Sequence, residues 1–112
     1  MDNQIFIQKD SFTQDPSTVK FTFLEGGKDQ SGFVVLFEAK YYAYRNKCQH
    51  LGVELDWDSN EFFEEEEKFI VCATHGAIYE PSSGKCLMGP CAGKKLEILN
   101  LKILEDKLIV TI

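Results

Sequence analysis

Several features that define large classes of proteins are missing from this chain of 112 residues. No stretch approaches the roughly 20 consecutive apolar residues that cross a membrane, and residues 1–4 do not begin a basic segment followed by an apolar run, as a secretory signal does. A basic excess is also missing, because 12 Lys and Arg stand against 18 Asp and Glu, a formal net charge of −6. We therefore expect a cytoplasmic protein that binds neither nucleic acid nor anionic membranes, since both repel an acidic surface.

Helical periodicity, internal repeats and linkers are missing as well. Apolar residues instead alternate with polar ones, which is typical of half-buried strands, and 44% of the chain is hydrophobic. The predicted strands lie at Ile5–Ile7, Val19–Phe23, Gly32–Glu38, Tyr41–Arg45, Leu96–Ile103 and Leu108–Ile112, with turns at Glu25–Asp29, Ala39-Lys40 and Glu105-Asp106. The pattern predicts an all-β protein that forms one domain over residues 1–112.

An irregular stretch from Asn46 to Gly93 separates the predicted hairpins, and it holds all four cysteines and both histidines. Two short motifs stand out, Cys48-Gln49-His50 and Cys72-Ala73-Thr74-His75. Together they supply two thiolates and two imidazoles, which suit either a tetrahedral zinc or a [2Fe–2S] cluster with two Cys and two His ligands. A structural zinc site usually pairs its cysteines with each other. Because each motif here mixes Cys and His, the pattern favours the cluster, and zinc stays the alternative.

The run Cys48–Gly52 together with Cys72–Gly76, followed by Gly84 and by Gly89-Pro90, resembles the Rieske iron–sulfur domain. This resemblance implies an antiparallel β-sandwich, with a small cluster-binding subdomain at about 46–93 inserted in the β base. The stretch from Leu51 to Val71 is longer than is usual between the two motifs of that family. Its acidic segment at 61–67 can form a loop without moving the ligands.

The resemblance also implies a ligand set. Cys48 and Cys72 hold one iron as thiolates, and His50 and His75 hold the other as neutral imidazoles, in one [2Fe–2S] cluster per chain. The residues expected around the cluster are Leu51, Gly52, Gly76, Tyr79, Gly89 and Pro90. Glycines after each histidine let the backbone turn tightly, so that N–H groups approach the sulfurs.

The type of Rieske protein follows from positions that differ from the respiratory members. Those members carry a disulfide across the cluster, and Val53 and Thr74 stand at the corresponding positions. Their serine, which donates to a bridging sulfide, corresponds to Ala77, so this hydrogen bond is missing. Their tyrosine, which donates to a cysteine sulfur, corresponds to Tyr79, so that bond is kept. Fewer hydrogen bonds to sulfur stabilise the reduced cluster less well, so we expect a low potential, as in soluble Rieske ferredoxins.

The expected function is one-electron transfer, from a reductase to a terminal enzyme such as a ring-hydroxylating oxygenase. The chain is not expected to be an enzyme, because a mononuclear iron site would need two further histidines. Alternatives are a small redox subunit of a nitrite-reductase-type complex, a zinc-stapled interaction module, and a redox sensor that uses Cys86 and Cys91. The acidic segment Glu64–Glu67 is either a solvated loop or a docking patch for a basic partner.

Overall fold

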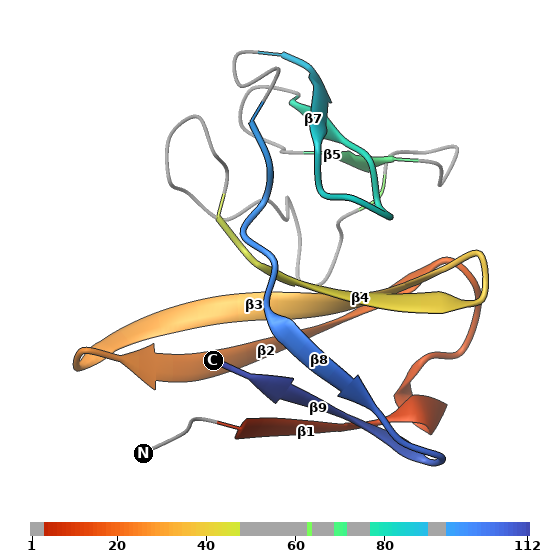
Figure 1. Cartoon of the computed structure of the whole chain (residues 1–112), viewed down its shortest axis with the longest axis vertical. Helices are drawn as coiled ribbons and strands as arrows, with labels where there is room; N and C mark the ends of the chain where they lie inside the picture. Colours follow the sequence, from red (N-terminus) through yellow and green to blue (C-terminus); the bar gives the residue numbers. More distant parts are fainter. Residues whose placement is uncertain (1–3, 48–62, 64–68, 72–76, 90–93) are drawn as a thin grey trace.

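A computed structural model describes residues 4–47, 63, 69–71, 77–89 and 94–112, and the structural statements below refer to these residues (Figure 1). They form nine strands and one short 3-10 turn, η1. The elements are β1 (Gln4–Gln8), η1 (Lys9–Ser11), β2 (Ser17–Glu25), β3 (Lys28–Phe37), β4 (Lys40–Arg45), β5 (Ile70–Val71), β6 (Ile78–Tyr79), β7 (Cys86–Met88), β8 (Asn100–Ile103) and β9 (Lys107–Thr111). In this described part of the chain, no helix has the length and apolar character needed to span a membrane. The expected all-β class is confirmed.

The strands form three antiparallel sheets of three strands each. Sheet A has the order β1-β9-β8, sheet B has the order β2-β3-β4, and sheet C has the order β5-β6-β7. Sheets A and B build the base, and sheet C lies over the β4 side of the base (Figure 1). The chain leaves the base after β4 and returns to it with β8, so sheet C occupies the interval between two base strands.

Sheet B is the middle layer, and β3 is its central strand. Phe33, Val34 and Val35 are each 0% exposed, which requires cover on both faces. Successive side chains of a strand point to opposite faces. Accordingly, Phe33 and Val35 pack in the core toward sheet C, whereas Val34 packs in the core toward sheet A.

Two hydrophobic cores therefore hold the layers together. The core between sheets A and B contains Ile7, Phe21, Phe23, Val34, Ala43, Leu99, Leu108 and Val110. The core between sheets B and C contains Phe33, Val35, Tyr44, Ile70, Ala77, Tyr79, Cys86 and Leu96. The second core shows that sheet C is packed on the base through buried side chains from β3 and β4.

The β3–β4 turn differs from the expected one by one position. It is formed by Glu38 and Ala39, whose φ angles are 50° and 67°, and not by Ala39-Lys40. Such φ values are uncommon for residues with a Cβ. The Asp15 carboxylate accepts hydrogen bonds from both turn N–H groups, at 3.0 Å from Glu38 N and 2.7 Å from Ala39 N. A side chain 23 and 24 residues away in sequence thus stabilises the turn.

The stretch from Asn46 to Gly93 is more regular than the sequence pattern predicted, because it contains sheet C. Ile70 pairs with Tyr79 and Val71 with Ile78, and Tyr79 also pairs with Cys86. Phe63 adds a bridge to Ile70. Strands of two residues are too short to give an alternating pattern, so the sequence alone did not reveal them.

Candidate metal centre

The proposed ligands Cys48, His50, Cys72 and His75 lie outside the described residues, and so do Leu51, Gly52, Gly76 and Pro90. The structure describes the elements that flank them. The first motif follows the end of β4, and the second lies between β5 and β6. Since Val71 and Ile78 are paired, the strands that precede and follow the second motif lie side by side.

Arg45 holds the end of β4, three residues before Cys48. Its Nη1 and Nη2 donate to the two carboxylate oxygens of Glu25, both at 3.1 Å, and its Nε donates to Glu97 Oε2 at 2.7 Å. The guanidinium also lies over the Phe23 ring, 5.3 Å from its centroid. Burial opposes the charge, but the hydrogen bonds and charges of the two glutamates raise the pKa of Arg45 overall.

The backbone reinforces the same position. Arg45 N donates to Glu97 O at 2.9 Å, and Asn46 N donates to Ser31 O at 2.9 Å. Asn46 is buried, at 4% exposed. The chain therefore enters the first motif from a point that is bonded to β3 and to the segment before β8.

Gly89 holds the loop after β7 against the end of the second motif. Its φ is +104°, and an added Cβ would lie 2.8 Å from Ala77 Cα. A glycine is required here for both reasons, since a side chain would clash with backbone and strain φ. Ala77 is itself fully buried. Gly89 thus lies against Ala77, two residues after the second motif, and its expected place around the cluster stays a prediction.

Tyr44 joins the base to the β6–β7 connection. Its hydroxyl donates to Pro81 O at 2.6 Å, and the residue is 1% exposed. Burial, and then the neighbouring Tyr42 and Glu80, raise the pKa of Tyr44 far above its ordinary value. The phenol therefore stays protonated and donates this hydrogen bond over the usual pH range.

Two residues singled out from the sequence lie in the core of sheet C. Tyr79 is fully buried, and Cys86 is 1% exposed. The Cys86 thiol donates to Met88 O at 3.3 Å. Cys91 lies outside the described residues, so a redox sensor that uses both cysteines stays a prediction.

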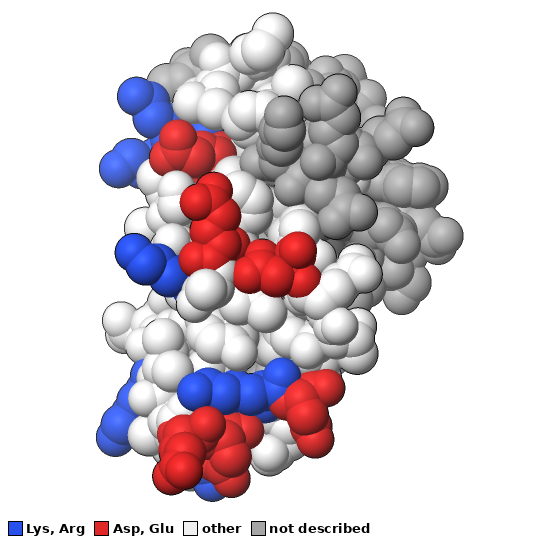
Figure 2. All heavy atoms as spheres, turned by 90° about the vertical axis from the view of Figure 1, so that its right-hand side faces the viewer, with Lys and Arg blue, Asp and Glu red and all other residues white. Residues whose placement is uncertain are grey.

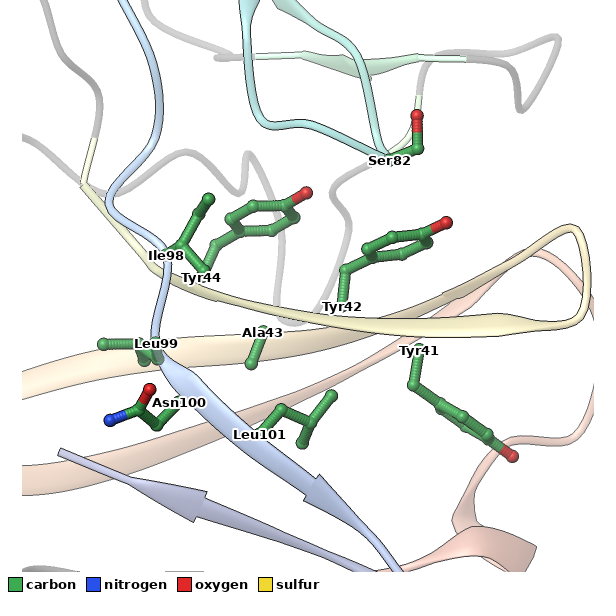
Figure 3. A pocket seen from close by; sticks show the side chains of 9 residues that line it. All are labelled: Tyr41, Tyr42, Ala43, Tyr44, Ser82, Ile98, Leu99, Asn100 and Leu101. Carbon is green, nitrogen blue, oxygen red and sulfur yellow. The ribbon is translucent and has the colours of Figure 1, made fainter.

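The described residues contain no second metal site, since no group of three His, Cys, Asp or Glu side chains comes together among them. They do contain an open cavity of about 320 Å³ where β8 diverges from β4 (Figure 3). Tyr42 and Tyr44 point toward the β6–β7 connection with Ser82, whereas Tyr41 and Ala43 point to the other side of β4. The cavity thus lies between layers, and its lining has no His, Cys, Asp or Glu side chain.

The chemistry of the donor set and the close approach at Gly89 both suit a cluster held between two neighbouring loops. The sequence profile of the Rieske [2Fe-2S] domain family matches residues 6–105. The chain belongs to the Rieske [2Fe-2S] domain family. Its cofactor is therefore a Rieske-type [2Fe–2S] cluster, and zinc is set aside as the metal.

Solved structures share this fold. The ferredoxin of carbazole 1,9a-dioxygenase from Nocardioides aromaticivorans IC177 is 21% identical, with a TM-score of 0.68 and 96% of each chain covered. A complex of reduced oxygenase and oxidized ferredoxin in carbazole 1,9a-dioxygenase contains a chain with a TM-score of 0.71 and 18% identity, covering 96% of this chain and 91% of that one. The terminal oxygenase from Novosphingobium sp. KA1 gives 0.73 at 16% identity, but only 29% of its length is covered. No curated protein matches.

Sequence reasoning missed the residues that position the chain next to the two motifs. Arg45, Glu25 and Glu97 belong to no metal motif, and the two carboxylates lie 20 and 52 residues from the arginine. Tyr44 was seen only as part of a strand. Their place in the sequence could have identified them, because Tyr44 and Arg45 end the strand that leads into the first motif.

Proposed function

We propose that this chain is a Rieske ferredoxin that carries single electrons from a reductase to a terminal enzyme such as a ring-hydroxylating oxygenase. The observation that carries the proposal is the end-to-end match with a ferredoxin, which covers 96% of both chains, against 29% of the terminal oxygenase. The two histidines of the sequence both belong to the cluster motifs, which leaves none for a mononuclear iron. The chain is accordingly an electron carrier and not a catalytic subunit.

The ligands in this proposal are Cys48, His50, Cys72 and His75. When bound, the cluster supplies reversible one-electron chemistry at a potential set by its ligands and surroundings. The described residues fix the chain next to both motifs. Arg45 is bonded to Glu97 before the first motif, Val71 pairs with Ile78 on either side of the second, and Gly89 lies against Ala77.

The proposal includes the organisation and location of the protein. Residues 1–112 form one Rieske domain, with the cluster-binding subdomain at about 46–93 inserted between β4 and β8. The position of sheet C in that interval supports this division. We place the protein in the cytoplasm, where closely spaced cysteines more often hold a metal than form disulfides. The buried position of Cys86 argues against a redox sensor that depends on solvent access to this thiol.

The test is spectroscopic, with the protein purified without oxygen. We expect visible absorption and electron paramagnetic resonance of a Rieske cluster, two irons and two acid-labile sulfides per chain, and reduction by one electron. Cys48→Ser and His75→Ala should abolish the signals, whereas Cys86→Ala should keep them because Cys86 is not a ligand. A colourless protein, or a spectrum unchanged by Cys48→Ser and His75→Ala, would refute the ligand set.

A further inference from the structure

Two lysines are paired with each other next to β7. Lys85 and Lys95 form an antiparallel bridge between the start of β7 and the segment before β8. Hydrogen bonds flank this pair on both sides, from Leu96 N to Gly84 O at 2.8 Å and from Cys86 N to Lys94 O at 2.7 Å. The pair itself is thus of the non-hydrogen-bonded type, in which opposite side chains come closest.

Both lysines are exposed, and neither pairs with a carboxylate of any described residue. The nearby Glu97 is already bound to Arg45, at 2.7 Å. Like charges directly opposite each other on two strands destabilise a sheet. Such an arrangement in a chain of net charge −6 concentrates positive charge at one place on an otherwise acidic protein.

Two exposed apolar side chains lie beside the lysines. Leu87 is 40% exposed and Met88 is 62% exposed. The pairing of β6 with β7 shifts between Ile78 and Tyr79, which face Met88 and Cys86, so Leu87 is an extra residue in β7. This bulge changes the alternation: Cys86 points into the core, and both following side chains are exposed to solvent. Bulges commonly redirect side chains in this way next to functional sites.

Lys85, Lys95, Leu87 and Met88 together form what we call the β7 surface. It adjoins the chain next to the second motif, since Met88 pairs with Ile78, three residues after His75 in sequence. In the upper half of the face in Figure 2, basic side chains line one edge, with carboxylates directly inward of them. Apolar contacts bordered by charges of one sign are typical of transient docking sites.

We propose that the β7 surface docks an acidic protein partner in electron transfer, with Leu87 and Met88 at the contact and Lys85 and Lys95 steering the approach. The proposal rests on the proposed function, because it assigns the surface to a redox partner of the carrier. Charge complementarity selects the occupant: two ammonium groups that pair with no carboxylate of the described residues attract carboxylates, and the remaining acidic surface repels an acidic protein from other approaches. The surface thus also favours one docking orientation.

The test uses two protein oxidants, plastocyanin, an acidic copper protein, and cytochrome c, a basic haem protein. The reduced protein is mixed with each in a stopped-flow instrument over a range of ionic strength. Lys85→Gln/Lys95→Gln should lower the second-order rate constant with plastocyanin by about fivefold at low salt and not lower that with cytochrome c. The difference should vanish at about 1 M salt, where screening acts over about 3 Å.

Matched variants control for net charge and for loss of apolar area. Lys40→Gln/Lys102→Gln removes the same charge from exposed positions in the base, and an equal effect of both lysine pairs would overturn the proposal. Leu87→Ala/Met88→Ala should slow plastocyanin at high salt too, whereas Leu24→Ala/Ile103→Ala, also exposed, should not. A high-salt rate unaffected by Leu87→Ala/Met88→Ala would show that the surface makes no contact.

Two further experiments test whether something other than an acidic protein binds the β7 surface. Lysine-dependent cosedimentation with anionic phospholipid vesicles would overturn the protein partner in favour of a membrane, and dimerisation lost in Leu87→Ala/Met88→Ala would reassign the surface to a second copy. The variants should keep the cluster spectrum of the unmodified protein. If the unmodified protein itself has no cluster, the proposed function fails. If the cluster spectrum is intact but the rate constants with plastocyanin do not change in the variants, only the proposed role of the β7 surface is refuted.

Discussion

Replacing Tyr44 with phenylalanine should destabilise the protein in a manner that depends on pH. Tyr44 is 1% exposed, and its hydroxyl donates to the backbone oxygen of Pro81 at 2.6 Å. The variant keeps the ring, which packs between sheets B and C, but leaves a buried carbonyl without this donor. An unsatisfied buried group costs about 1–3 kcal/mol, so at pH 8 we expect the free energy of unfolding to fall by that amount.

The difference between the two proteins should shrink at high pH. Burial raises the pKa of Tyr44 in the folded protein well above the value of about 10 that it has when unfolded. Because the folded pKa is the higher one, the stabilisation is fully present below pH 10 and is lost as pH rises above it. By linkage, the unfolded state gains about 1.4 kcal/mol between pH 9 and pH 11 from ionisation of this phenol alone. The variant has no phenol at this position and escapes that loss.

The assay is urea unfolding of both proteins at several pH values from 8 to 11, followed by circular dichroism. Other groups titrate in both proteins, so their effects cancel in the difference. Tyr42→Phe, on the same strand, controls for the loss of a tyrosine whose hydroxyl makes no hydrogen bond among the described residues. A difference between the unmodified protein and Tyr44→Phe that is constant from pH 8 to pH 11 would refute the argument that the folded state holds the Tyr44 proton.

Three other substitutions test the contacts that Gly89, Asp15 and Arg45 make. Gly89→Ala should reduce stability by about 1–3 kcal/mol more than Gly27→Ala in thermal unfolding, because only at Gly89 would the added Cβ meet backbone, at 2.8 Å from Ala77 Cα. Both glycines have positive φ, so equal losses in the two variants would show that the clash has no effect. Asp15→Asn should cost about 1 kcal/mol in urea unfolding by weakening two hydrogen bonds to the turn, and an unchanged midpoint would show that the turn does not need them. Arg45→Lys should cost about 1–2 kcal/mol, because an ammonium cannot reproduce three directed bonds, and retained stability would contradict this.

The base of the fold was predictable because its strands are long enough to carry a pattern. In β9, buried residues alternate with partly buried ones over all five positions, and in β2 the buried Phe21 and Phe23 alternate with more exposed neighbours. The Gly26-Gly27 turn between β2 and β3 has positive φ at both glycines, as a two-residue hairpin needs. The unbroken apolar run in β3 likewise reflects burial on both faces. These are local signals, and each can be read without knowing the partner strand.

The parts that sequence reasoning missed depend on distant residues. The Glu38-Ala39 turn has no glycine or asparagine to mark it, and its geometry rests on a carboxylate 23 residues earlier. The strands β5 and β6 have two residues each, so only their packing against the base defines them. The cluster motifs were the opposite case, because metal binding fixes residue types at short spacing and so leaves a strong mark in the sequence.

The proposed ligands and the residues that position the chain beside them are therefore constrained differently. A metal site tolerates little change in its ligands, but the bonds that position it can be made by any residues of suitable reach and charge. In this chain they are made by Tyr44 and Arg45, whose side chains engage the β6–β7 connection on one side and the segment before β8 on the other. Since adjacent residues of a strand point to opposite faces, one strand end can bind two segments at once. A single strand, β4, thereby fixes the base, the entry to the first motif and the connection beneath the second.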